Sequence, residues 1–357
     1  MDLSNLSLPN VIKIGNKVVG RGRPTFIIAE IGNNHNGDIE LARKSVIAAA
    51  QAGADAVKFQ KRDVDEVFTQ ELLSKPQTHS RTLGVTYGDY RRKQELTEEE
   101  LSELKELSHS LGLVFFATPF DLKSAALLDR VGMDCWKIAS FDVTHAPLLE
   151  YVAGRGQPVI LSTGLSTIEE RDRAVNAILK YNKNLIVQQC VSIYPTPNED
   201  LNIGAVATLL ERYRPLPVGY SGHEIGFIPT IAAVALGACS VERHFTLDKA
   251  LPGPDHSTVS LDIPEFAEMA RQIRRIEKAV ADKNVYLHEK EIAHRNKHGK
   301  SVVSRVSIPA GTLINDEMLC FKSPGYGIKP TLVHTVVGKT AKVSIPEDAI
   351  ILEEFLT

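Results

Sequence analysis

The chain has 357 residues, of which 43% are hydrophobic and 24% charged, and its formal net charge is −3. This length predicts two domains, because single cores stop growing near roughly 250–300 residues. The charge argues against a general nucleic-acid binder, which would carry a basic excess or stripe. No apolar run approaches the roughly 20 residues of a membrane span, and the first ten residues lack the basic flank and apolar core of a signal peptide.

The four cysteines lie far apart in the chain and form no C-x-x-C spacing: Cys135, Cys190, Cys239 and Cys320. The sequence therefore indicates neither a zinc cluster nor a disulfide framework. We expect a cytoplasmic protein with reduced thiols and with no nucleic-acid or membrane partner.

Short apolar strands alternate with amphipathic helices along most of the chain. A strand is predicted at 25–32, a helix at 38–53 that Gly53 ends, and a second strand at 54–60. After an irregular insertion, residues 96–112 are predicted to form a helix in which Thr97 and Glu100 make a capping box. Six further strands, separated by helical stretches, are predicted at 113–119, 133–140, 157–163, 184–190, 216–222 and 238–244.

These eight strand–helix units predict a (β/α)8 barrel. The strands are nearly continuous runs of Val, Ile and Ala, which indicates that both faces of a parallel sheet are buried. The rival fold is a doubly wound open sheet. Such a sheet usually carries a Gly-rich phosphate turn after its first strand, and the one candidate, "GNNHNG" at 32–37, lacks that spacing.

The alternation of strands and helices ends after a last amphipathic helix predicted at 264–282. A polar, charged stretch at 286–298 is predicted to be a linker, and "VSIP" occurs twice beyond it, at 306–309 and 343–346. The repeat predicts a small, pseudo-symmetric, mostly β module that is short for an independent core and is expected to pack on a partner. We therefore predict a barrel domain at 1–285 with an N-terminal extension at 1–24, a linker at 286–298 and a C-terminal domain at 299–357.

Polar residues collect where the predicted strands end, which is the end of a barrel that carries the active site. Lys58 and Lys137 lie within apolar strands, and with neighbouring hydroxyl groups they would form a cradle for a phosphate dianion. The alternative is a Lys–Glu pair inside the barrel, made with Glu30 or Glu242. The residues expected at this mouth are Glu30, Lys58, Gln60, Thr118, Lys137, Ser140, Asp142, Ser162, Ser192, Tyr194, Ser221, His223, Glu242 and His244.

His223 and His244 are predicted at the ends of adjacent strands. Imidazole is a common metal ligand, and two histidines with open positions leave room for water and a substrate oxygen around a divalent ion. The spacing equally allows one histidine to be a general acid and the other to be structural. Arg243 is expected to point away from Glu242 and His244 and to pair with a carboxylate on the barrel wall.

Many segments of the chain resemble the sialic acid (nonulosonic acid) synthase family. They are "AEIGNNHNG", "VKFQ", "ATPF", "WKIASFD", "ILSTG", "QCVSIYPTP", "GYSGHEIG", "ERHFTLDK" and "GPDHSTVSL", in this order across about residues 20–285. The tail, "GKSVVSRVSIPAGTLINDEML", resembles the antifreeze-like (SAF) module of the same family. The resemblance implies a barrel enzyme that condenses phosphoenolpyruvate with an open-chain N-acylmannosamine, free or as its 6-phosphate, to a nine-carbon 2-keto acid and phosphate.

The resemblance also implies roles for individual residues. Phosphoenolpyruvate would be bound by Lys58, Thr118, Lys137, Ser140, Ser162, Ser192 and Ser221. A divalent ion, Mn²⁺ or Mg²⁺, would be bound by His223 and His244, with Glu242 orienting the His244 ligand. The sugar and the attacking water would be positioned by Glu30, Gln60, Asp142, Tyr194 and Asp255. The residues expected to be catalytic are Glu30, Lys58, Lys137, His223 and His244.

Two positions depart from the pattern of many bacterial members, which carry Asn at Ser192 and Arg at Ser323. The segments "GKSVV", "KFQK" and "YGDYRRKQE" are closer to the animal-type enzymes, which use the 6-phosphate of the sugar. Basic groups of the insertion are therefore candidates for binding a sugar phosphate or are part of a solvated surface: Arg81, Arg91 and Arg92. The family also implies a domain-swapped homodimer in which Lys322 or Tyr326 contributes to a lid.

Three rival functions remain open at this point. One is a related phosphoenolpyruvate-dependent synthase that acts on mannose or on a shorter aldose. The second is a synthase for a diacetamido sugar of the legionaminic or pseudaminic type. The third is a non-catalytic sugar-binding or ice-binding protein with the same fold.

Overall fold

The computed structural model describes residue 3 and residues 6–77, 83–282 and 284–357. The chain divides into two compact units, residues 1–282 and residues 283–357. Within the described ranges, no helix is both long enough and apolar enough to cross a lipid bilayer.

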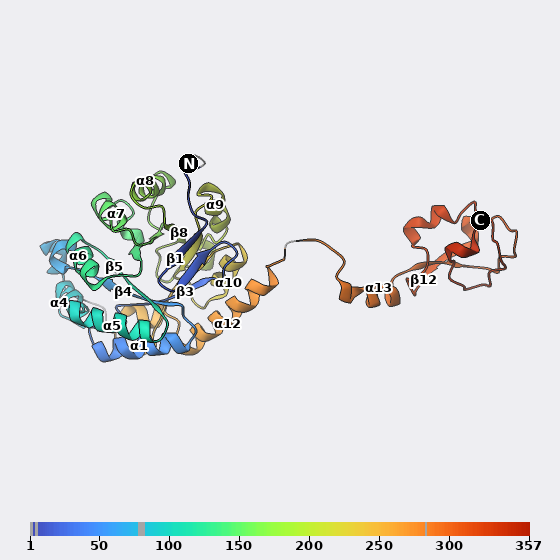
Figure 1. The fold of residues 1–357 in the computed structure, drawn as a ribbon. Helices are drawn as coiled ribbons and strands as arrows, with labels where there is room; N and C mark the ends of the chain where they lie inside the picture. Colours follow the sequence, from blue (N-terminus) through green and yellow to red (C-terminus); the bar gives the residue numbers. More distant parts are fainter. Residues whose placement is uncertain (1–2, 4–5, 78–82, 283) are drawn as a thin grey trace. The chain divides into compact units, whose positions relative to one another are not determined.

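The first unit is built on a parallel, eight-stranded sheet that is nearly closed into a barrel (Figure 1). The strands are hydrogen-bonded in the order β5-β4-β3-β10-β9-β8-β7-β6. A backbone hydrogen bond from Asp134 N to Phe115 O (3.2 Å) joins the segment before β6 to β5. The strands are β3 (Phe26–Gly32), β4 (Ala56–Lys61), β5 (Val114–Pro119), β6 (Trp136–Ile138), β7 (Val159–Ser162), β8 (Leu185–Cys190), β9 (Val218–Gly222) and β10 (Ser240–His244). The predicted (β/α)8 barrel is confirmed.

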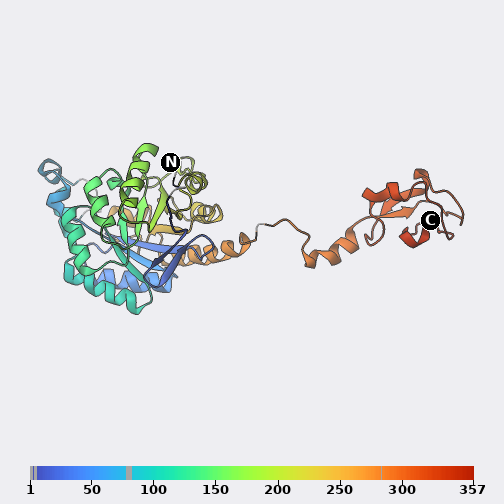
Figure 2. The ribbon, with the colours of Figure 1, turned by 45° about the horizontal axis from the view of Figure 1, so that its top comes forward.

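Helices alternate with the strands and surround the sheet (Figure 2). The predicted capping box begins α5: Thr97 N donates to Glu100 Oε2 (2.8 Å), and Glu100 N donates to Thr97 Oγ1 (3.2 Å). Leu101 and Leu104 of the same helix are fully buried in the core. The long helices are α1 (Ile39–Gln51), α5 (Glu98–Ser110), α6 (Leu122–Val131), α7 (Ala146–Ala153), α8 (Ile168–Leu179), α9 (Ala205–Arg212), α10 (Ile228–Ala235) and α12 (Ile263–Ala279).

Shorter helices lie in the connections. The irregular insertion after β4 contains α2 (Val64–Val67), α3 (Gln70–Leu73) and α4 (Tyr87–Lys93), and α11 (Pro254–Thr258) follows β10. Thr86 and Asp89 form a capping box at the start of α4. The 3-10 helices are η1 (Ser140–Asp142), η2 (Asn198–Asp200), η3 (Glu289–Glu291), η4 (Asp316–Met318), η5 (Pro330–Thr335) and η6 (Glu353–Phe355).

The N-terminal extension forms an antiparallel hairpin of β1 (Val11–Ile14) and β2 (Lys17–Gly20). Ile12, Ile14 and Val19 are buried in the barrel core. Lys17 Nζ lies 2.9 Å from Oδ1 of Asp55, which directly precedes β4. The hairpin therefore covers the end of the barrel at which the strands begin, and leaves the opposite end to the active site.

The second unit has its own hydrophobic core and a small sheet of β11 (Ser301–Ser304) and β12 (Leu319–Lys322). Its two "VSIP" segments pair with each other, because Ile308 and Ile345 exchange backbone hydrogen bonds of 2.8 Å in both directions. The segment predicted as a linker contains helix α13 (Ile292–His298). This helix has no buried residue, so its sequence lacks the apolar period by which a helix is recognised.

Candidate active site

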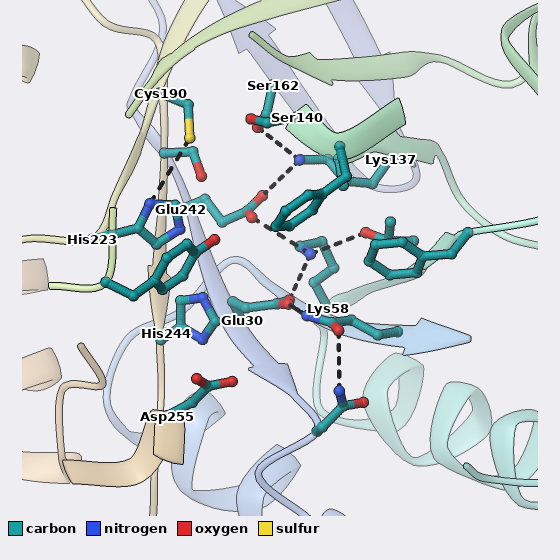
Figure 3. Close-up of a pocket in the computed structure, with 18 of the residues that line it drawn as sticks. Glu30, Lys58, Lys137, Ser140, Ser162, Cys190, His223, Glu242, His244 and Asp255 are labelled. Atoms are coloured by element: carbon teal, nitrogen blue, oxygen red, sulfur yellow. Dashed lines mark hydrogen bonds and ion pairs between the residues drawn. The ribbon is translucent and has the colours of Figure 1, made fainter. Parts of the chain in front are cut away.

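One cavity, of about 220 Å³, lies at the C-terminal ends of the barrel strands (Figure 3). In barrel enzymes the active site is found at this end. All but two of the predicted site residues line the cavity: Glu30, Lys58, Gln60, Thr118, Lys137, Ser140, Ser162, Tyr194, Ser221, His223, Glu242, His244 and Asp255. Asp142 and Ser192 are not part of the lining. Residues scattered over more than two hundred positions of the sequence are therefore brought together as predicted.

The register of the parallel strands explains why these side chains meet. Glu30 of β3 is paired with Lys58 of β4 on one side and with His244 of β10 on the other. Glu242 is paired with Ser221 of β9 in the same way. Neighbouring strands of a parallel sheet run in the same direction, so paired residues reach the same height in the barrel.

The two lysines of the cavity alternate with two carboxylates, in the order Glu30, Lys58, Glu242 and Lys137 (Figure 3). Lys58 Nζ is 2.7 Å from Glu30 Oε2 and 3.5 Å from Glu242 Oε1. Lys137 Nζ is 3.8 Å from Glu242 Oε2. The alternative of a Lys–Glu pair is thus realised, but inside the same cavity as the predicted phosphate cradle. Glu242, which we expected to orient His244, lies within ion-pair distance of both lysines instead.

Burial and pairing set the charges of this group. Burial lowers the pKa of Lys58, but Glu242 and Glu30 outweigh it and raise the pKa above its ordinary value. Burial lowers the pKa of Lys137, and Glu242 offsets this only in part. Burial raises the pKa of Glu30, whereas Lys137 and Lys58 overcome burial and lower the pKa of Glu242. The group therefore holds charges of both signs that an anionic ligand can rearrange.

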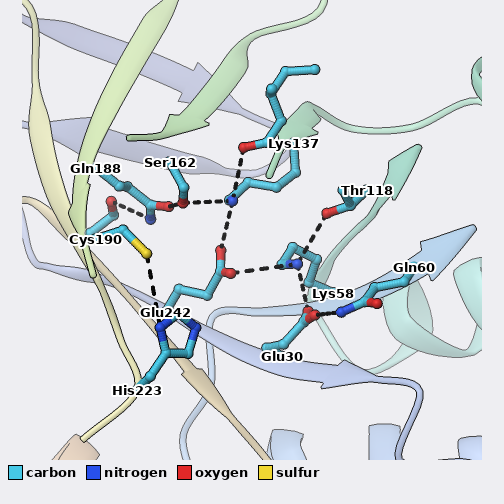
Figure 4. A network of polar contacts seen from close by, with 12 residues as sticks. Glu30, Lys58, Gln60, Thr118, Lys137, Ser162, Gln188, Cys190, His223 and Glu242 are labelled. Carbon is cyan, nitrogen blue, oxygen red and sulfur yellow. Dashed lines mark hydrogen bonds and ion pairs between the residues drawn. The ribbon is translucent and has the colours of Figure 1, made fainter. Parts of the chain in front are cut away.

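A chain of polar side chains fixes Lys137 in place (Figure 4). Lys137 Nζ donates to Ser162 Oγ (2.7 Å), and Ser162 Oγ donates to Gln188 Oε1 (3.1 Å). Gln188 Nε2 donates in turn to Ser240 Oγ (3.3 Å). Gln188 was not predicted, because its side chain acts one contact away from the cavity. On the other side, Lys58 Nζ donates to Thr118 Oγ1 (3.1 Å).

The two predicted histidines are neighbours in the cavity, with ring centroids 5.5 Å apart and ring planes tilted by 53°. His223 Nδ1 lies 2.8 Å from Val191 O. A carbonyl oxygen only accepts hydrogen bonds, so Nδ1 carries the proton and Nε2 keeps its lone pair. Burial, and then the charge of His223, hold the pKa of His244 well below its ordinary range, so this ring is neutral. Both rings therefore have a nitrogen suited to a metal ion.

His223 has surroundings that also suit a proton carrier. Burial lowers its pKa, but the Cys190 thiol and the Val191 carbonyl outweigh burial and raise it. The ring of Tyr194 lies 4.0 Å from the His223 ring and 6.0 Å from the His244 ring, centroid to centroid. The surroundings of His223 therefore fit both roles that the sequence allowed, metal ligand and general acid.

A buried ion pair is formed by the sequence neighbours of the two histidines, Glu224 and Arg243. Arg243 Nη1 lies 2.8 Å from Glu224 Oε1, and both side chains are fully buried. Arg243 also donates to Glu224 O (2.7 Å), to Gly226 O (2.6 Å) and to Thr230 Oγ1 (3.0 Å). The prediction that Arg243 pairs with a carboxylate on the barrel wall is confirmed. Since Glu224 follows His223 and Arg243 precedes His244, the pair ties the two histidine-bearing segments together.

Asp142 and Ser192 differ from the prediction. Asp142 is the last residue of η1, the turn that begins at Ser140, and it is buried beside the cavity rather than in its lining, where burial raises its pKa to about 6. The Ser192 hydroxyl lies 3.8 Å from Cys190 Sγ. Strand-end position alone therefore did not tell which of several consecutive loop residues faces the cavity.

The cavity lining also contains residues that we did not predict as site residues. Cys190, the last residue of β8, has its Sγ 3.9 Å from His223 Nδ1. Arg62 follows directly after β4, so the strand-end rule would have found it had the rule been carried two residues beyond Gln60. The remaining unpredicted lining residues are Asn33, Phe120, Ala139 and Phe141.

The basic residues of the insertion separate in the structure. Arg91 lines the cavity. Arg92 lies 2.6 Å from Asp65 on the surface and is not part of the lining. Arg81 lies outside the described residues.

The predicted residues of the second unit make contacts within that unit. Lys322 Nζ lies 2.5 Å from Asp348 Oδ1. Ser323 Oγ accepts a hydrogen bond from Lys300 Nζ (3.0 Å), and Tyr326 is exposed. Their role at a lid remains a prediction.

A (β/α)8 barrel with a cavity of lysines, carboxylates, hydroxyls and histidines at the C-terminal strand ends is the architecture of a barrel enzyme. Two family models match the chain: the NeuB family at residues 45–285 and the SAF domain at residues 299–357. The chain belongs to the NeuB family, which is the family of sialic and nonulosonic acid synthases.

Similar proteins cover nearly the whole chain. An uncharacterized protein of Methanocaldococcus jannaschii is 41% identical, over 95% of this chain and 97% of its own. N-acetylneuraminate-9-phosphate synthase of Homo sapiens is 37% identical, over 95% and 94%. N,N'-diacetyllegionaminic acid synthase of Legionella pneumophila is 35% identical, over 96% and 97%. The crystal structure of an N-acetylneuraminic acid synthetase from Leptospira borgpetersenii, in complex with citrate, has a TM-score of 0.72 and 34% identity, and the match covers 81% of this chain and 97% of that one.

Proposed function

We propose that this enzyme condenses phosphoenolpyruvate with an open-chain N-acylmannosamine, forming a C–C bond and releasing phosphate by C–O cleavage. The product is a nine-carbon 2-keto acid. The observation that carries the proposal is the presence, in one cavity, of two buried lysines among hydroxyl groups and of two imidazoles whose ring centroids lie 5.5 Å apart. The first set suits a phosphoester, and the second suits the oxygen of an aldehyde or a cation that binds it.

Phosphoenolpyruvate binds at the lysine end in this proposal. Lys58 and Lys137 supply two ammonium groups, and the hydroxyls of Thr118, Ser140, Ser162 and Ser221 complete the cradle. Charge-assisted hydrogen bonds of this kind are about twice as strong as neutral ones. An arriving phosphoester replaces the carboxylates as the partner of the lysines, and both lysines then stabilise the leaving phosphate.

Glu30 takes the proton of the water that adds to C2. Its side chain is held by Gln60, whose Nε2 donates to Glu30 Oε1 (2.6 Å). Burial raises the pKa of Glu30, which makes its carboxylate a better base at neutral pH. Its negative charge also stabilises the oxocarbenium-like centre that forms at C2 after the enol carbon has attacked the aldehyde. Gln60, Tyr194 and Asp255 hold the sugar.

His223 and His244 are the residues that would hold a divalent ion, Mn²⁺ or Mg²⁺. The fit is that of two nitrogen donors: the Nδ1–H of His223 is used by Val191, which leaves Nε2 for the ion when the ring is unprotonated, and the lowered pKa of His244 keeps that ring neutral. Within the described ranges, no cluster of three or more His, Cys, Asp or Glu side chains forms a metal site, so other positions are left to water and substrate oxygens. Bound there, such an ion would polarise the aldehyde.

We further propose that two chains form a swapped homodimer, with the C-terminal unit of one chain over the barrel mouth of the other. Large apolar side chains in the segments that follow β6, β7 and β9 support this, because they are exposed in the single chain and come after the strand ends at which the cavity lies: Phe141, Leu165, Ile225 and Ile228. Exposed apolar groups gathered on one face mark an interaction surface. Light scattering after gel filtration tests the dimer, and a monomer at micromolar concentration would contradict it.

A second acceptor class is favoured by one comparison. The diacetyllegionaminic acid synthase of Legionella pneumophila is nearly as similar to this chain as the human enzyme, so a diacetamido sugar is the alternative acceptor. Mannose and shorter aldoses are the remaining candidates that the same chemistry allows.

Phosphate release from phosphoenolpyruvate tests the proposal. The full-length protein is incubated with phosphoenolpyruvate and Mn²⁺, with and without N-acetylmannosamine, its 6-phosphate, mannose or a diacetamido sugar. We expect phosphate release that depends on an N-acylmannosamine and equals the keto acid formed. Release with the diacetamido sugar alone supports the alternative acceptor. No release with any sugar would overturn the enzymatic proposal and favour a binding protein.

A further inference from the structure

Two guanidinium groups line the cavity in addition to the two lysines: those of Arg62 and Arg91. Arg62 follows β4, and Arg91 lies on α4 of the insertion. The chemistry described above uses neither of them. Lys58 lies 2.7 Å from Glu30, whereas neither guanidinium has a carboxylate of the described residues closer than 3.8 Å.

Arg62 is a buried cation with neutral hydrogen-bond partners. It is 7% exposed, its guanidinium lies 3.9 Å from the centre of the Phe120 ring, and its Nη2 donates to Gln60 Oε1 (2.5 Å). The nearest carboxylate is that of Glu95, with Oε1 3.8 Å from Arg62 Nη1. Glu95 is already engaged by Lys61, whose Nζ lies 3.0 Å from Oε2. The charge of Arg62 is therefore only partly balanced.

Arg91 is held by aromatic rings rather than by an acid. Its guanidinium lies 5.0 Å from the ring centre of Tyr87 and 5.4 Å from that of Tyr90, and its Nε donates to Tyr87 Oη (2.9 Å). In the part of the chain that the structure describes, no carboxylate forms an ion pair with Arg91. The rings orient the guanidinium by cation–π contact and leave its outer donors available.

The two arginines act on each other and on the same part of the cavity. Burial, and then the charge of Arg91, lower the pKa of Arg62 to about 10. Burial raises the pKa of Asp255, and the charges of Arg91 and Arg62 offset part of this rise. In Figure 3 Asp255 lies beyond the two histidines, on the side away from Lys137 and Ser162. The arginines thus belong to the end of the cavity that the acceptor would occupy.

From this arrangement we infer that Arg62 and Arg91 form a second anion subsite, which binds a phosphate monoester on the acceptor sugar. The inference rests on the proposed function and narrows its acceptor to a phosphorylated N-acylmannosamine. Two like charges held together in a mostly buried place are costly until an anion neutralises them. The planar guanidinium matches the oxygens of a phosphate in a bidentate manner, which the ammonium groups at the other end of the cavity do not.

Arg92 provides a matched control for this pair. It is adjacent to Arg91 on the same helix and has the same charge, but it pairs with Asp65 and lies outside the cavity lining. Arg92→Gln removes one positive charge from α4 without changing the subsite. A general electrostatic effect of the helix would therefore appear in this variant, and a specific contact would not.

The test compares two acceptors with the full-length protein, phosphoenolpyruvate and Mn²⁺. The measured quantity is the ratio of kcat/KM for N-acetylmannosamine 6-phosphate to kcat/KM for N-acetylmannosamine. We expect the wild-type protein to prefer the phosphorylated sugar, and Arg62→Gln and Arg91→Gln each to lower the ratio at least about tenfold, through a higher KM for that sugar. Arg62→Lys keeps the positive charge but loses the planar guanidinium. Its ratio is expected to lie between those of the wild type and Arg62→Gln. Arg92→Gln should leave the ratio unchanged.

Three results would overturn the inference: a wild-type protein that does not prefer the phosphorylated sugar, arginine variants that lose activity equally with both sugars, or an equal loss of the ratio in Arg92→Gln. If no sugar supports phosphate release, the proposed function fails by itself. Calorimetric titration with N-acetylmannosamine 6-phosphate then decides about the subsite. Binding weakened by Arg62→Gln and not by Arg92→Gln supports it, and binding that both leave unchanged refutes it.

Discussion

The buried ion pair of Glu224 and Arg243 allows a quantitative prediction. Glu224→Gln keeps the size of the side chain but removes its negative charge, and so leaves Arg243 buried without a counter-charge. Both side chains are fully buried. Glu224 also accepts hydrogen bonds from Tyr220 Oη (2.8 Å) and Thr230 Oγ1 (2.6 Å). The substitution therefore disturbs a closed network, not an isolated contact.

The expected loss of stability is large. Removing one partner of a buried pair costs about 3–5 kcal/mol, because the other charge stays uncompensated. The same pair replaced as a whole by apolar residues of similar size is often neutral or stabilising. We therefore expect Glu224→Gln to lower the free energy of unfolding by about 3 kcal/mol or more, and Glu224→Met combined with Arg243→Met to recover most of that loss.

The sequence provides a selective assay. Trp136 is the single tryptophan of the chain and is buried in the barrel unit, so its fluorescence during urea denaturation reports the unfolding of that unit alone. An unfolding free energy of Glu224→Gln within about 1 kcal/mol of the wild type would refute the reasoning, since an average point substitution already causes a change of that size. A double variant less stable than Glu224→Gln would refute it as well.

Three further predictions concern the cavity and its surroundings. Lys137→Met should lower kcat/KM for phosphoenolpyruvate by about tenfold to a hundredfold, the size expected for a lost charge-assisted hydrogen bond, and an unchanged KM in initial-rate assays would contradict the cradle. His244→Ala should weaken Mn²⁺ binding, measured by electron paramagnetic resonance, and abolish metal-dependent turnover; full activity with a chelator present would exclude the metal role. Burial raises the pKa of Asp142 from 3.8 to about 6, so its contribution to stability is present below pH 3.8 and is lost as the pH rises through 6. Asp142→Asn should raise the unfolding free energy at pH 7 by up to about 3 kcal/mol, and urea titrations that show the same pH dependence as the wild type would contradict this.

Much of the fold could be predicted because the pattern of the sequence is local. The run of apolar residues that makes each strand, and the Thr97–Glu100 capping box, depend only on residues close in sequence. The short helix α13 could not be predicted in the same way, because a helix without a buried face has no apolar period.

The site could be predicted as a set of residues but not as a set of contacts. Strand ends meet at one end of a barrel, and this rule brought Lys58, Lys137 and the two histidines together. Partners depend on register and loop path: Glu242 lies at the lysines instead of His244, and Asp142 lies outside the cavity lining. Arg62 was missed because the strand-end rule was not carried beyond Gln60, and Cys190, at the end of β8, because position in the sequence does not show that a side chain faces the cavity.

The path of the bridging oxygen of phosphoenolpyruvate tests the central claim most directly. Phosphoenolpyruvate labelled with heavy oxygen between C2 and phosphorus is incubated with the protein, Mn²⁺ and the acceptor, and both products are analysed by mass spectrometry. Since water attacks C2 and the C–O bond breaks, the account predicts that the label leaves with inorganic phosphate and that an unlabelled nine-carbon keto acid forms in equal amount. Label retained in the organic product, or phosphate released without an acceptor, would contradict it.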